Sequence, residues 1–223
     1  MFNKIAPYYD FLNHFLSLGI DRSWRRKAIK ELKSHEPLEL IVDIATGTAD
    51  VALETAKRID VKQIIGVDIA QEMLDIGRKK IDKKALGETI SLELGDSEDL
   101  RFEDSSVDAV TVAFGVRNFE NVSKGLSEIY RVLKPGALLI VIEFSKPRIF
   151  PLKQLYHFYF KNVLPFIGRI TSKEPKAYRY LYESVQAFPD GRQFTELLEK
   201  EGFKNCTWKP LTLGICSIYT GTK

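Results

Sequence analysis

The sequence predicts an α/β fold in which helices flank a mostly parallel sheet that ends in an antiparallel strand. Short β-rich segments alternate with segments of helical periodicity through the middle of the chain. This alternation is typical of parallel strands joined by right-handed helical crossovers. Near the end of the chain, two β-rich segments flank a short turn at residues 211–213. They indicate a β-hairpin and therefore an antiparallel closing strand.

The individual elements can be assigned in chain order. Apolar runs with few charges predict buried strands at residues 40–45, 63–69, 91–94, 107–114 and 137–144. Helices are expected at residues 51–59, 71–85 and 192–200, with Gly202 following the last of them as a breaker. One more helix is indicated by the spacing of Leu126, Ile129, Tyr130 and Leu133. We expect the Lys-Pro-Gly sequence at residues 134–136 to end that helix.

Composition limits the classes of protein to which the chain can belong. A length of 223 residues fits one α/β domain. The longest purely apolar run is residues 137–142, whereas a membrane-spanning helix needs ~20 such residues. The N-terminus lacks the pattern of a signal peptide, and two cysteines do not make a disulfide framework, so we expect a cytoplasmic protein. The net charge of +3 is too small to indicate a nucleic-acid partner.

Two aromatic segments lie outside the α/β alternation. Residues 1–33 are rich in Phe and Tyr, and residues 150–182 carry nine aromatic side chains. Aromatic residues usually just pack in a core, which is one interpretation. The other is a lid over an apolar substrate. We therefore expect a single domain, residues 1–223, with residues 1–33 and 150–182 as a substrate lid.

The loop after the first strand has the position of a nucleoside site. In open α/β sheets, ligands bind beyond the carboxyl ends of the strands. Gly47 lies in this loop, and Asp68 ends the second strand 21 residues later. That spacing is typical of a carboxylate that accepts hydrogen bonds from both hydroxyls of a ribose. The loop lacks the further glycines that bring backbone N–H groups to a pyrophosphate, and a single glycine after a strand is just as often structural.

An acidic loop follows the third strand. It begins at Gly95, Asp96 and Ser97 and continues through several more acids. Carboxylates at this edge of a sheet can accept a hydrogen bond from the exocyclic amine of adenine. For Glu98, Asp99, Glu103 and Asp104 the alternative is an ordinary solvated surface.

Together these features resemble the class I S-adenosylmethionine-dependent methyltransferases, which have a Rossmann-like sheet. More narrowly, the chain is similar to the MenG/UbiE family of quinone C-methyltransferases. The matching blocks are NKIAPYYDFLN near the start, DRSWRR, FGVRNF at residues 114–119, EFSKP at residues 143–147 and YLYESVQAFPDGRQF. These blocks span nearly the whole chain.

The resemblance implies S-adenosylmethionine as the cofactor. Its contacts would be Thr48, Asp68, Asp96 and Ser97, beside the loop glycine Gly47. The family often has a serine where this chain has Ala113, so a hydroxyl contact to the cofactor is lost or replaced there. No pattern of metal ligands is visible in the sequence.

The implied reaction is attack of a hydroquinone ring carbon on a sulfonium methyl group. The ring becomes more nucleophilic as a phenolic hydroxyl loses its proton. Arg117 and Asn118 follow the fourth strand, and an arginine there could stabilise a phenolate or orient a water molecule. Alternatively, Arg117 pairs with an acid and fixes the loop.

The N-terminal segment supplies further candidates for acid–base chemistry. Tyr8 and Asp10 could fold over the site, with Asp10 as a base or, equally well, as a helix cap. For His14 and His157, packing in aromatic surroundings is the preferred interpretation.

The implied acceptor is a polyprenyl hydroquinone, which resides in a bilayer. Peripheral contact with the inner face of a membrane is therefore expected, and basic residues in two regions could provide it. They are Arg22, Arg25, Arg26, Lys30 and Lys33, and Lys153, Lys161, Arg169, Lys173 and Lys176. A solvated helix face is the alternative. A homodimer is compatible with the sequence but not specified by it.

Three other functions compete with quinol methylation. A small-molecule or sterol-type C-methyltransferase would share the cofactor core. An RNA or protein methyltransferase would show a basic groove and salt-dependent binding. A binding protein that has lost the cofactor is the third, and Ala113 is the feature that keeps it open.

Overall fold

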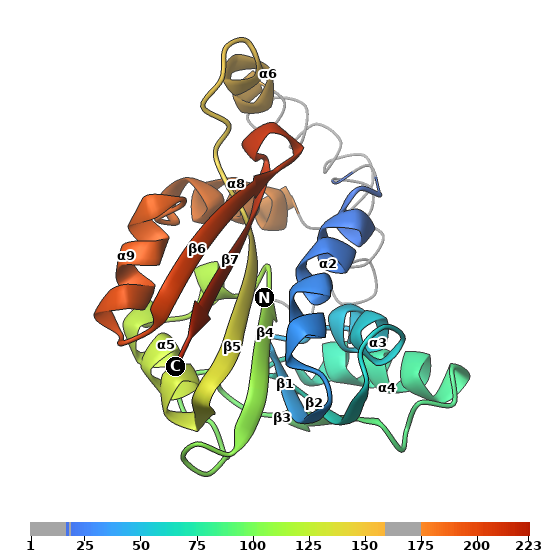
Figure 1. The fold of residues 1–223 in the computed structure, drawn as a ribbon. Helices are drawn as coiled ribbons and strands as arrows, with labels where there is room; N and C mark the ends of the chain where they lie inside the picture. The colour runs from blue at the N-terminus through green and yellow to red at the C-terminus, as the bar shows by residue number, and fades with distance from the viewer. Residues whose placement is uncertain (1–16, 18, 159–174) are drawn as a thin grey trace.

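One mixed sheet organises the molecule. The computed structural model describes Ser17, residues 19–158 and residues 175–223. Seven strands follow the order β3-β2-β1-β4-β5-β7-β6 (Figure 1). They are β1 (Leu38–Ile44), β2 (Val61–Asp68), β3 (Ile90–Leu94), β4 (Val107–Ala113), β5 (Leu133–Phe144), β6 (Lys204–Leu211) and β7 (Cys216–Thr222). The first five strands are parallel, and β7 is antiparallel to both of its neighbours, β5 and β6.

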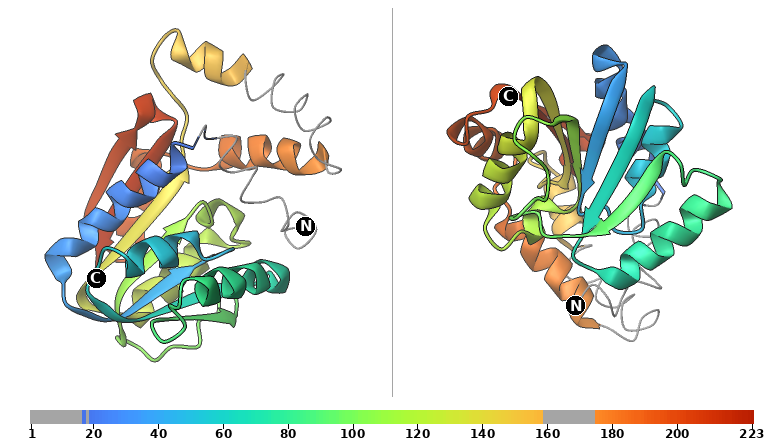
Figure 2. Two further views of the ribbon diagram at one scale, coloured as in Figure 1. Left: turned by 90° about the vertical axis from the view of Figure 1, so that its right-hand side faces the viewer. Right: turned by 90° about the horizontal axis from the view of Figure 1, so that it is seen from below.

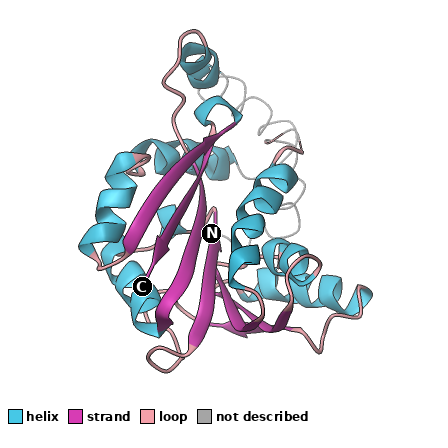
Figure 3. Ribbon diagram, viewed as in Figure 1, coloured by secondary structure: helices cyan, strands magenta, loops and turns pink. Residues whose placement is uncertain are grey.

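Helices cover both faces of this sheet (Figures 1 and 3). One face is covered by α2 (Asp21–Ile29), α3 (Asp50–Ala56) and α4 (Gln71–Lys83). The other is covered by α5 (Val122–Val132) and α9 (Arg192–Lys200). The remaining described helices are α6 (Leu152–Phe158), α8 (Pro175–Ala187) and three short 3-10 helices, η1 (Lys30–His35), η2 (Val116–Asn118) and η4 (Thr212–Gly214).

The apolar strand sequences follow from burial on both faces. Successive strand residues point to opposite sides, so Ile41 packs under α2 and α3 while Val42 packs under α5. The same alternation gives Ile140 to one core and Val141 to the other. A strand of this kind needs apolar residues at every position, which is why the runs could be recognised in the sequence.

The predicted sheet is confirmed, with one error at the end of α5. Lys134–Gly136 do not end a helix. The helix stops at Val132, and Leu133 is already extended and pairs with Val107 of β4. The next matched pair is Ala109 with Leu138, so residues 134–136 form an irregularity within β5. Gly136 accommodates it with a φ of 80°.

Strand order places a ligand site at the carboxyl edge. The chain runs from β1 outward to β2 and β3 and then returns to the other side of β1 as β4. The loops after β1 and β4 therefore diverge and leave a crevice, as in other open α/β sheets. Figure 2 shows α8 crossing near this edge and α6 projecting beyond it.

Some expected features fall outside the described residues. Residues 1–16 and 159–174 are among them, and they include Tyr8, Asp10 and His14. The side chain of His157 is not described either. The assignment of residues 1–33 and 150–182 as a lid on one domain therefore remains a prediction.

Candidate active site

The loop after β1 has a strained backbone. Ala45, Gly47 and Ala49 all have positive φ values, 53°, 56° and 65°. Phe114, which follows β4 and faces this loop, has a φ of 58°. Residues with a Cβ atom rarely adopt this conformation, and they do so mainly at functional sites that the surrounding structure holds in place. The turn is closed by hydrogen bonds from Thr46 N to Val67 O (3.1 Å) and from Ala49 N to Thr46 O (3.0 Å).

Asp68 joins this loop to the end of β2. Its Oδ2 accepts from Gly47 N at 2.8 Å, and its Oδ1 accepts from Ala70 N at 2.8 Å. Burial raises the pKa of Asp68, and the two N–H groups oppose that rise. A carboxylate has about four lone-pair positions, so acceptor capacity remains after these two bonds. Asp68 is therefore both a loop anchor and an available acceptor for ribose hydroxyls.

A cleft of about 240 Å³ opens beside Asp68. It is bounded by the loops after the first four strands. Five expected site residues line it, namely Gly47, Asp68, Asp96, Ser97 and Asn118. Their positions at the carboxyl ends of neighbouring strands explain why they meet.

Apolar residues that sequence reasoning missed form the rest of the cleft. Ile69, Met73, Phe114 and Phe119 line it. Ile69 is 65% exposed, which is unusual for a large aliphatic side chain next to a strand end, and it offers a face for a planar ring. The available signal was an apolar residue directly after the acid that ends β2.

The cleft fits a nucleoside such as that of S-adenosylmethionine. The acceptor at Asp68, the acid and hydroxyl at Asp96 and Ser97, and the apolar surface of Ile69 match the hydroxyls, amine and ring of adenosine. Beside the cleft, the loops after β1 and β4 approach each other closely. A Cβ atom at Gly115 would lie only 2.5 Å from Ala45 Cβ.

Thr48 and Ala113 lie on the far side of the loop. They line a second cavity of about 30 Å³ together with Arg25 and Asp43. The hydroxyl of Thr48 accepts from Lys80 Nζ at 2.8 Å. The two residues therefore do not line the larger cleft, although Gly47 borders both spaces.

Asp43 is a buried acid beneath the same loop. Its two oxygens accept from the hydroxyls of Thr46 and Thr111, each at 2.6 Å. Burial raises the pKa of Asp43 to about 6, even though both hydroxyls and Arg25 favour the charged form. The carboxyl group of Asp43, in β1, therefore links the loop after β1 to β4.

Most acids after β3 have structural roles. Asp96 Oδ1 accepts from Glu98 N at 2.9 Å, and Glu98 Oε1 accepts from Asn121 N at 2.6 Å. Asp104 pairs with Arg131 at 2.7 Å. Glu98 therefore belongs to a network of loop contacts, whereas Asp104 is an exposed surface acid that pairs with Arg131.

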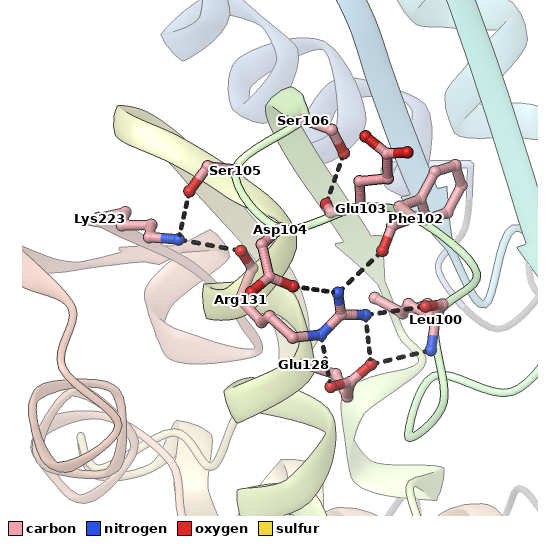
Figure 4. Close-up of polar contacts among 9 residues, drawn as sticks. All are labelled: Leu100, Phe102, Glu103, Asp104, Ser105, Ser106, Glu128, Arg131 and Lys223. Atoms are coloured by element: carbon pink, nitrogen blue, oxygen red, sulfur yellow. Dashed lines mark hydrogen bonds and ion pairs between the residues drawn. The ribbon is translucent and has the colours of Figure 1, made fainter.

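Arg131 is the centre of that network (Figure 4). It binds both carboxylate oxygens of Glu128, the carboxylate of Asp104, and the carbonyls of Leu100 and Phe102. Glu128 in turn accepts from Leu100 N at 3.0 Å. These partners raise the pKa of Arg131. The cluster ties the segment after the cleft acids to α5.

Arg117 forms a buried ion pair. Its Nη1 lies 2.7 Å from Oε2 of Glu143, with side-chain exposures of 8% and 0%. The guanidinium also stacks over Phe144, 5.5 Å from the ring centre. Burial raises the pKa of Glu143, and Arg117 opposes that rise. The alternative in which Arg117 pairs with an acid is the arrangement observed.

Arg117 nevertheless retains hydrogen-bonding capacity. Its Nε is buried and has no hydrogen-bond partner within the described part of the chain. Glu143 belongs to the EFSKP block, but only the structure shows that it holds Arg117. The contact joins residues 26 positions apart in the chain, beyond the reach of local sequence patterns.

Asn118 connects the cleft to α8. Its Oδ1 accepts from Tyr180 Oη at 3.1 Å, and its Nδ2 donates to Phe114 O at 3.3 Å. Tyr156 of α6 is buried close enough to Arg117 for that charge to lower its pKa, although burial raises it overall. Two helices of the 150–182 segment thus bring phenol groups to the surroundings of Arg117 and Asn118.

The described residues contain no group of three or more His, Cys, Asp or Glu side chains arranged to hold a metal ion. In the same described portion, no helix is long and apolar enough to cross a membrane.

Comparisons with known proteins agree with this geometry. Residues 1–223 match the model of the ubiE/COQ5 methyltransferase family. A demethylmenaquinone methyltransferase of Bacteroides fragilis is 48% identical, over 100% of this chain and 91% of its own length. A ubiquinone/menaquinone biosynthesis C-methyltransferase UbiE of Geotalea daltonii is 49% identical, over 100% of this chain and 94% of its own.

Solved structures show the same fold. A Thermotoga maritima SAM-dependent methyltransferase superposes with a TM-score of 0.68 at 21% identity, over 100% of both chains. A Haloferax volcanii methyltransferase, solved with the Trm112 activator, has a TM-score of 0.71 at 17% identity over 99% of this chain and 96% of its own.

Proposed function

The chain belongs to the ubiE/COQ5 methyltransferase family, and from this premise we propose that it methylates a ring carbon of a demethylmenaquinol or a related polyprenyl benzoquinol. It is an S-adenosylmethionine-dependent C-methyltransferase of quinone biosynthesis. The observation that supports this acceptor best is the full-length similarity to demethylmenaquinone methyltransferases.

The residues that line the cleft would hold the cofactor. Asp68 would accept from the ribose hydroxyls, and Asp96 and Ser97 would contact the adenine side. Ile69 would pack on the ring. When bound, S-adenosylmethionine supplies an electrophilic sulfonium methyl group. Thr48 and Ala113 border the smaller cavity beneath the loop, so they would support the loop and would not contact the cofactor in the larger cleft.

Arg117 would stabilise negative charge on the acceptor. A hydroquinone is a better carbon nucleophile as its hydroxyl loses a proton, so a fixed cation near that oxygen lowers the barrier. Glu143 holds the guanidinium through one N–H group. Arg117 does not itself line the cleft, and in this proposal its Nε, which has no partner among the described residues, would donate to a phenolate or a water molecule. Glu143 is therefore a positioning residue in this proposal.

Asn118 and Tyr180 would bring the acceptor to the cofactor. Asn118 lines the cleft, and Tyr180 reaches it from α8. This contact supports a role for α8 on the acceptor side of the site. Tyr8 and Asp10 remain candidates for the acid–base step on sequence grounds alone. The acceptor's polyprenyl tail would require peripheral contact with the inner face of a membrane.

Quinone analysis tests the proposed acceptor. Cells lacking the protein should accumulate the demethylated quinone, and complementation should restore the methylated form, as measured by mass spectrometry. In vitro, the purified chain should methylate a reduced acceptor and leave the oxidised quinone unmethylated. If no ring-methylated product forms from the reduced acceptor while S-adenosylmethionine binds, the acceptor assignment is wrong.

A further inference from the structure

Large apolar side chains are exposed at one end of the molecule, away from the cofactor cleft. Phe150 is 77% exposed, Leu213 68%, and Ile149 and Phe158 61% each. Burying such side chains is favourable, so a cluster left in water indicates a surface that meets a partner. We call these four residues the apical surface.

The apical surface is built from two segments that touch. Ile149, Phe150 and Phe158 belong to α6 and the loop before it, and Leu213 lies in the turn between β6 and β7. Ser145 Oγ donates to Gly214 O at 2.9 Å, which fixes the turn against the start of the α6 loop. Figure 1 shows α6 and this turn at the same end of the molecule.

The charge of this region differs from that of the rest of the chain. Residues 144–173 contain six Lys or Arg residues and no Asp or Glu. Because the whole chain has a net charge of +3, the remaining residues together carry −3. Arg148 is largely exposed, and Lys153 forms no ion pair with the described part of the chain. Arg148 and Lys153 therefore face solvent, as the exposed apolar residues do.

A basic groove lies at the foot of α6. It has a volume of about 580 Å³, and its lining includes Lys146, Arg148 and Lys153. The single acid in the lining, Asp190, is buried, and it pairs with Lys146 at 3.4 Å and with Arg148 at 3.9 Å. The groove thus has an excess of positive charge, which suits an anionic phosphate group.

The basic residues around α2 differ from those beside the apical surface in their ion pairs and in their apolar neighbours. On α2, Arg25 is buried and paired with Asp21 at 2.7 Å, and Arg26 is paired with Glu54 at 2.9 Å. Their charges are compensated within the protein. Arg22 on α2 and Lys30 at the start of η1 are exposed, but the apolar residues around them, including Trp24 and Ile29, are packed in the core.

We propose that the apical surface docks on an anionic lipid bilayer, with its apolar side chains in the interfacial region and Arg148 and Lys153 against lipid phosphates. Exposed aromatic residues beside cations that outnumber the neighbouring acids are the combination that binds such surfaces. The reason for docking rests on the proposed function, since a polyprenyl acceptor resides in the membrane. The surface itself is distinct from the cofactor cleft.

Vesicle sedimentation with the full chain tests this proposal. The protein should bind phosphatidylcholine vesicles containing phosphatidylglycerol at least tenfold more strongly than phosphatidylcholine alone, and added salt should weaken the binding. Arg148→Glu with Lys153→Glu should reduce binding at least tenfold. Arg22→Glu with Lys30→Glu (the α2 pair, at α2 and the start of η1) makes the same change of charge and should leave binding nearly unchanged.

A second pair of variants tests the apolar part. Phe150→Ser should weaken vesicle binding severalfold, whereas Leu94→Ser, at a residue that is 51% exposed on the far edge strand β3, should not. The proposal is overturned if the wild type does not distinguish the two vesicles, or if the α2 pair loses as much binding as the apical pair. It is also overturned if Phe150→Ser changes the oligomeric state and leaves vesicle binding intact.

Failure of docking can be separated from failure of the proposed function. All apical variants should bind S-adenosylmethionine like the wild type by calorimetry and should methylate a tail-less, water-soluble hydroquinone at the wild-type rate. A wild type that binds anionic vesicles but methylates no hydroquinone would refute the acceptor and leave the docking surface standing. The converse result would refute the surface alone.

Discussion

Removing the Asp68 carboxylate should weaken cofactor binding more than it weakens the fold. In Asp68→Ala, the two ribose hydroxyls lose a charged acceptor. A charge-assisted pair of hydrogen bonds contributes ~2–3 kcal/mol, so the dissociation constant for S-adenosylmethionine should rise about 30- to 150-fold.

The same substitution also affects the loop. Gly47 N and Ala70 N lose their acceptor, but Asp68 is only half-buried, so water can replace it. We expect a loss of ~1–2 kcal/mol in the free energy of unfolding. Asp68→Asn keeps one acceptor oxygen and places an amide N–H against the other donor, so its stability should be no better than that of Asp68→Ala.

Calorimetric titration at a temperature where each variant is folded measures the affinity, and chemical denaturation without cofactor measures stability. Asp75→Ala is the matched control, because Asp75 is an exposed acid on α4 that pairs with Arg78. It should change stability by less than ~0.5 kcal/mol and leave affinity unchanged. A folded Asp68→Ala protein with wild-type affinity would refute the ribose assignment.

Three further predictions concern Arg117, Asp43 and Arg131. Arg117→Ala should lower the turnover number much more than cofactor affinity, because its contact forms as phenolate charge develops. If the turnover number and the calorimetric affinity fall equally, Arg117 belongs to the cofactor site or to the fold instead. Asp43 has a pKa of about 6 when folded and 3.8 as the reference, so its contribution to stability should fall by ~2 kcal/mol as the pH rises from 4 to 7. Asp43→Asn should lack that fall in denaturation measured across this range, and parallel curves for the two proteins would contradict it. Arg131→Ala should lower the unfolding free energy by ~1–2 kcal/mol, because several acceptors lose their donor. The control Arg192→Ala removes an exposed pair within α9 and should cost less than ~0.5 kcal/mol. Similar losses in the two variants would show that the Arg131 network does not stabilise the fold.

The strands could be predicted because each is buried on both faces and has a nearly continuous apolar sequence. The hairpin was equally visible from the β-rich segments around residues 211–213. The end of α5 was not, because Lys-Pro-Gly is a common helix terminator and only the pairing of Leu133 with Val107 makes the segment part of a strand. Local sequence preference was overridden there by a contact across the sheet.

The site could be predicted where it depends on strand ends. Gly47, Asp68, Asp96 and Ser97 meet because parallel strands finish at one edge. Side-chain partners were harder to foresee. The sequence contains no sign that Lys80 reaches Thr48 across 32 positions. Such pairings depend on helix placement against the sheet, which residue spacing alone does not determine.

The two edges of the sheet restrict how copies of this protein could associate. An unpaired edge strand can recruit another strand by backbone hydrogen bonding, and short length, lysine, proline and bulges all oppose this. On one side β3 is only five residues long. On the other, β6 carries Lys209 and Pro210, and its register shifts between Lys204 and Thr207. Continuation of the sheet from one molecule into the next is therefore disfavoured at both ends, and a homodimer would have to form through helices or loops.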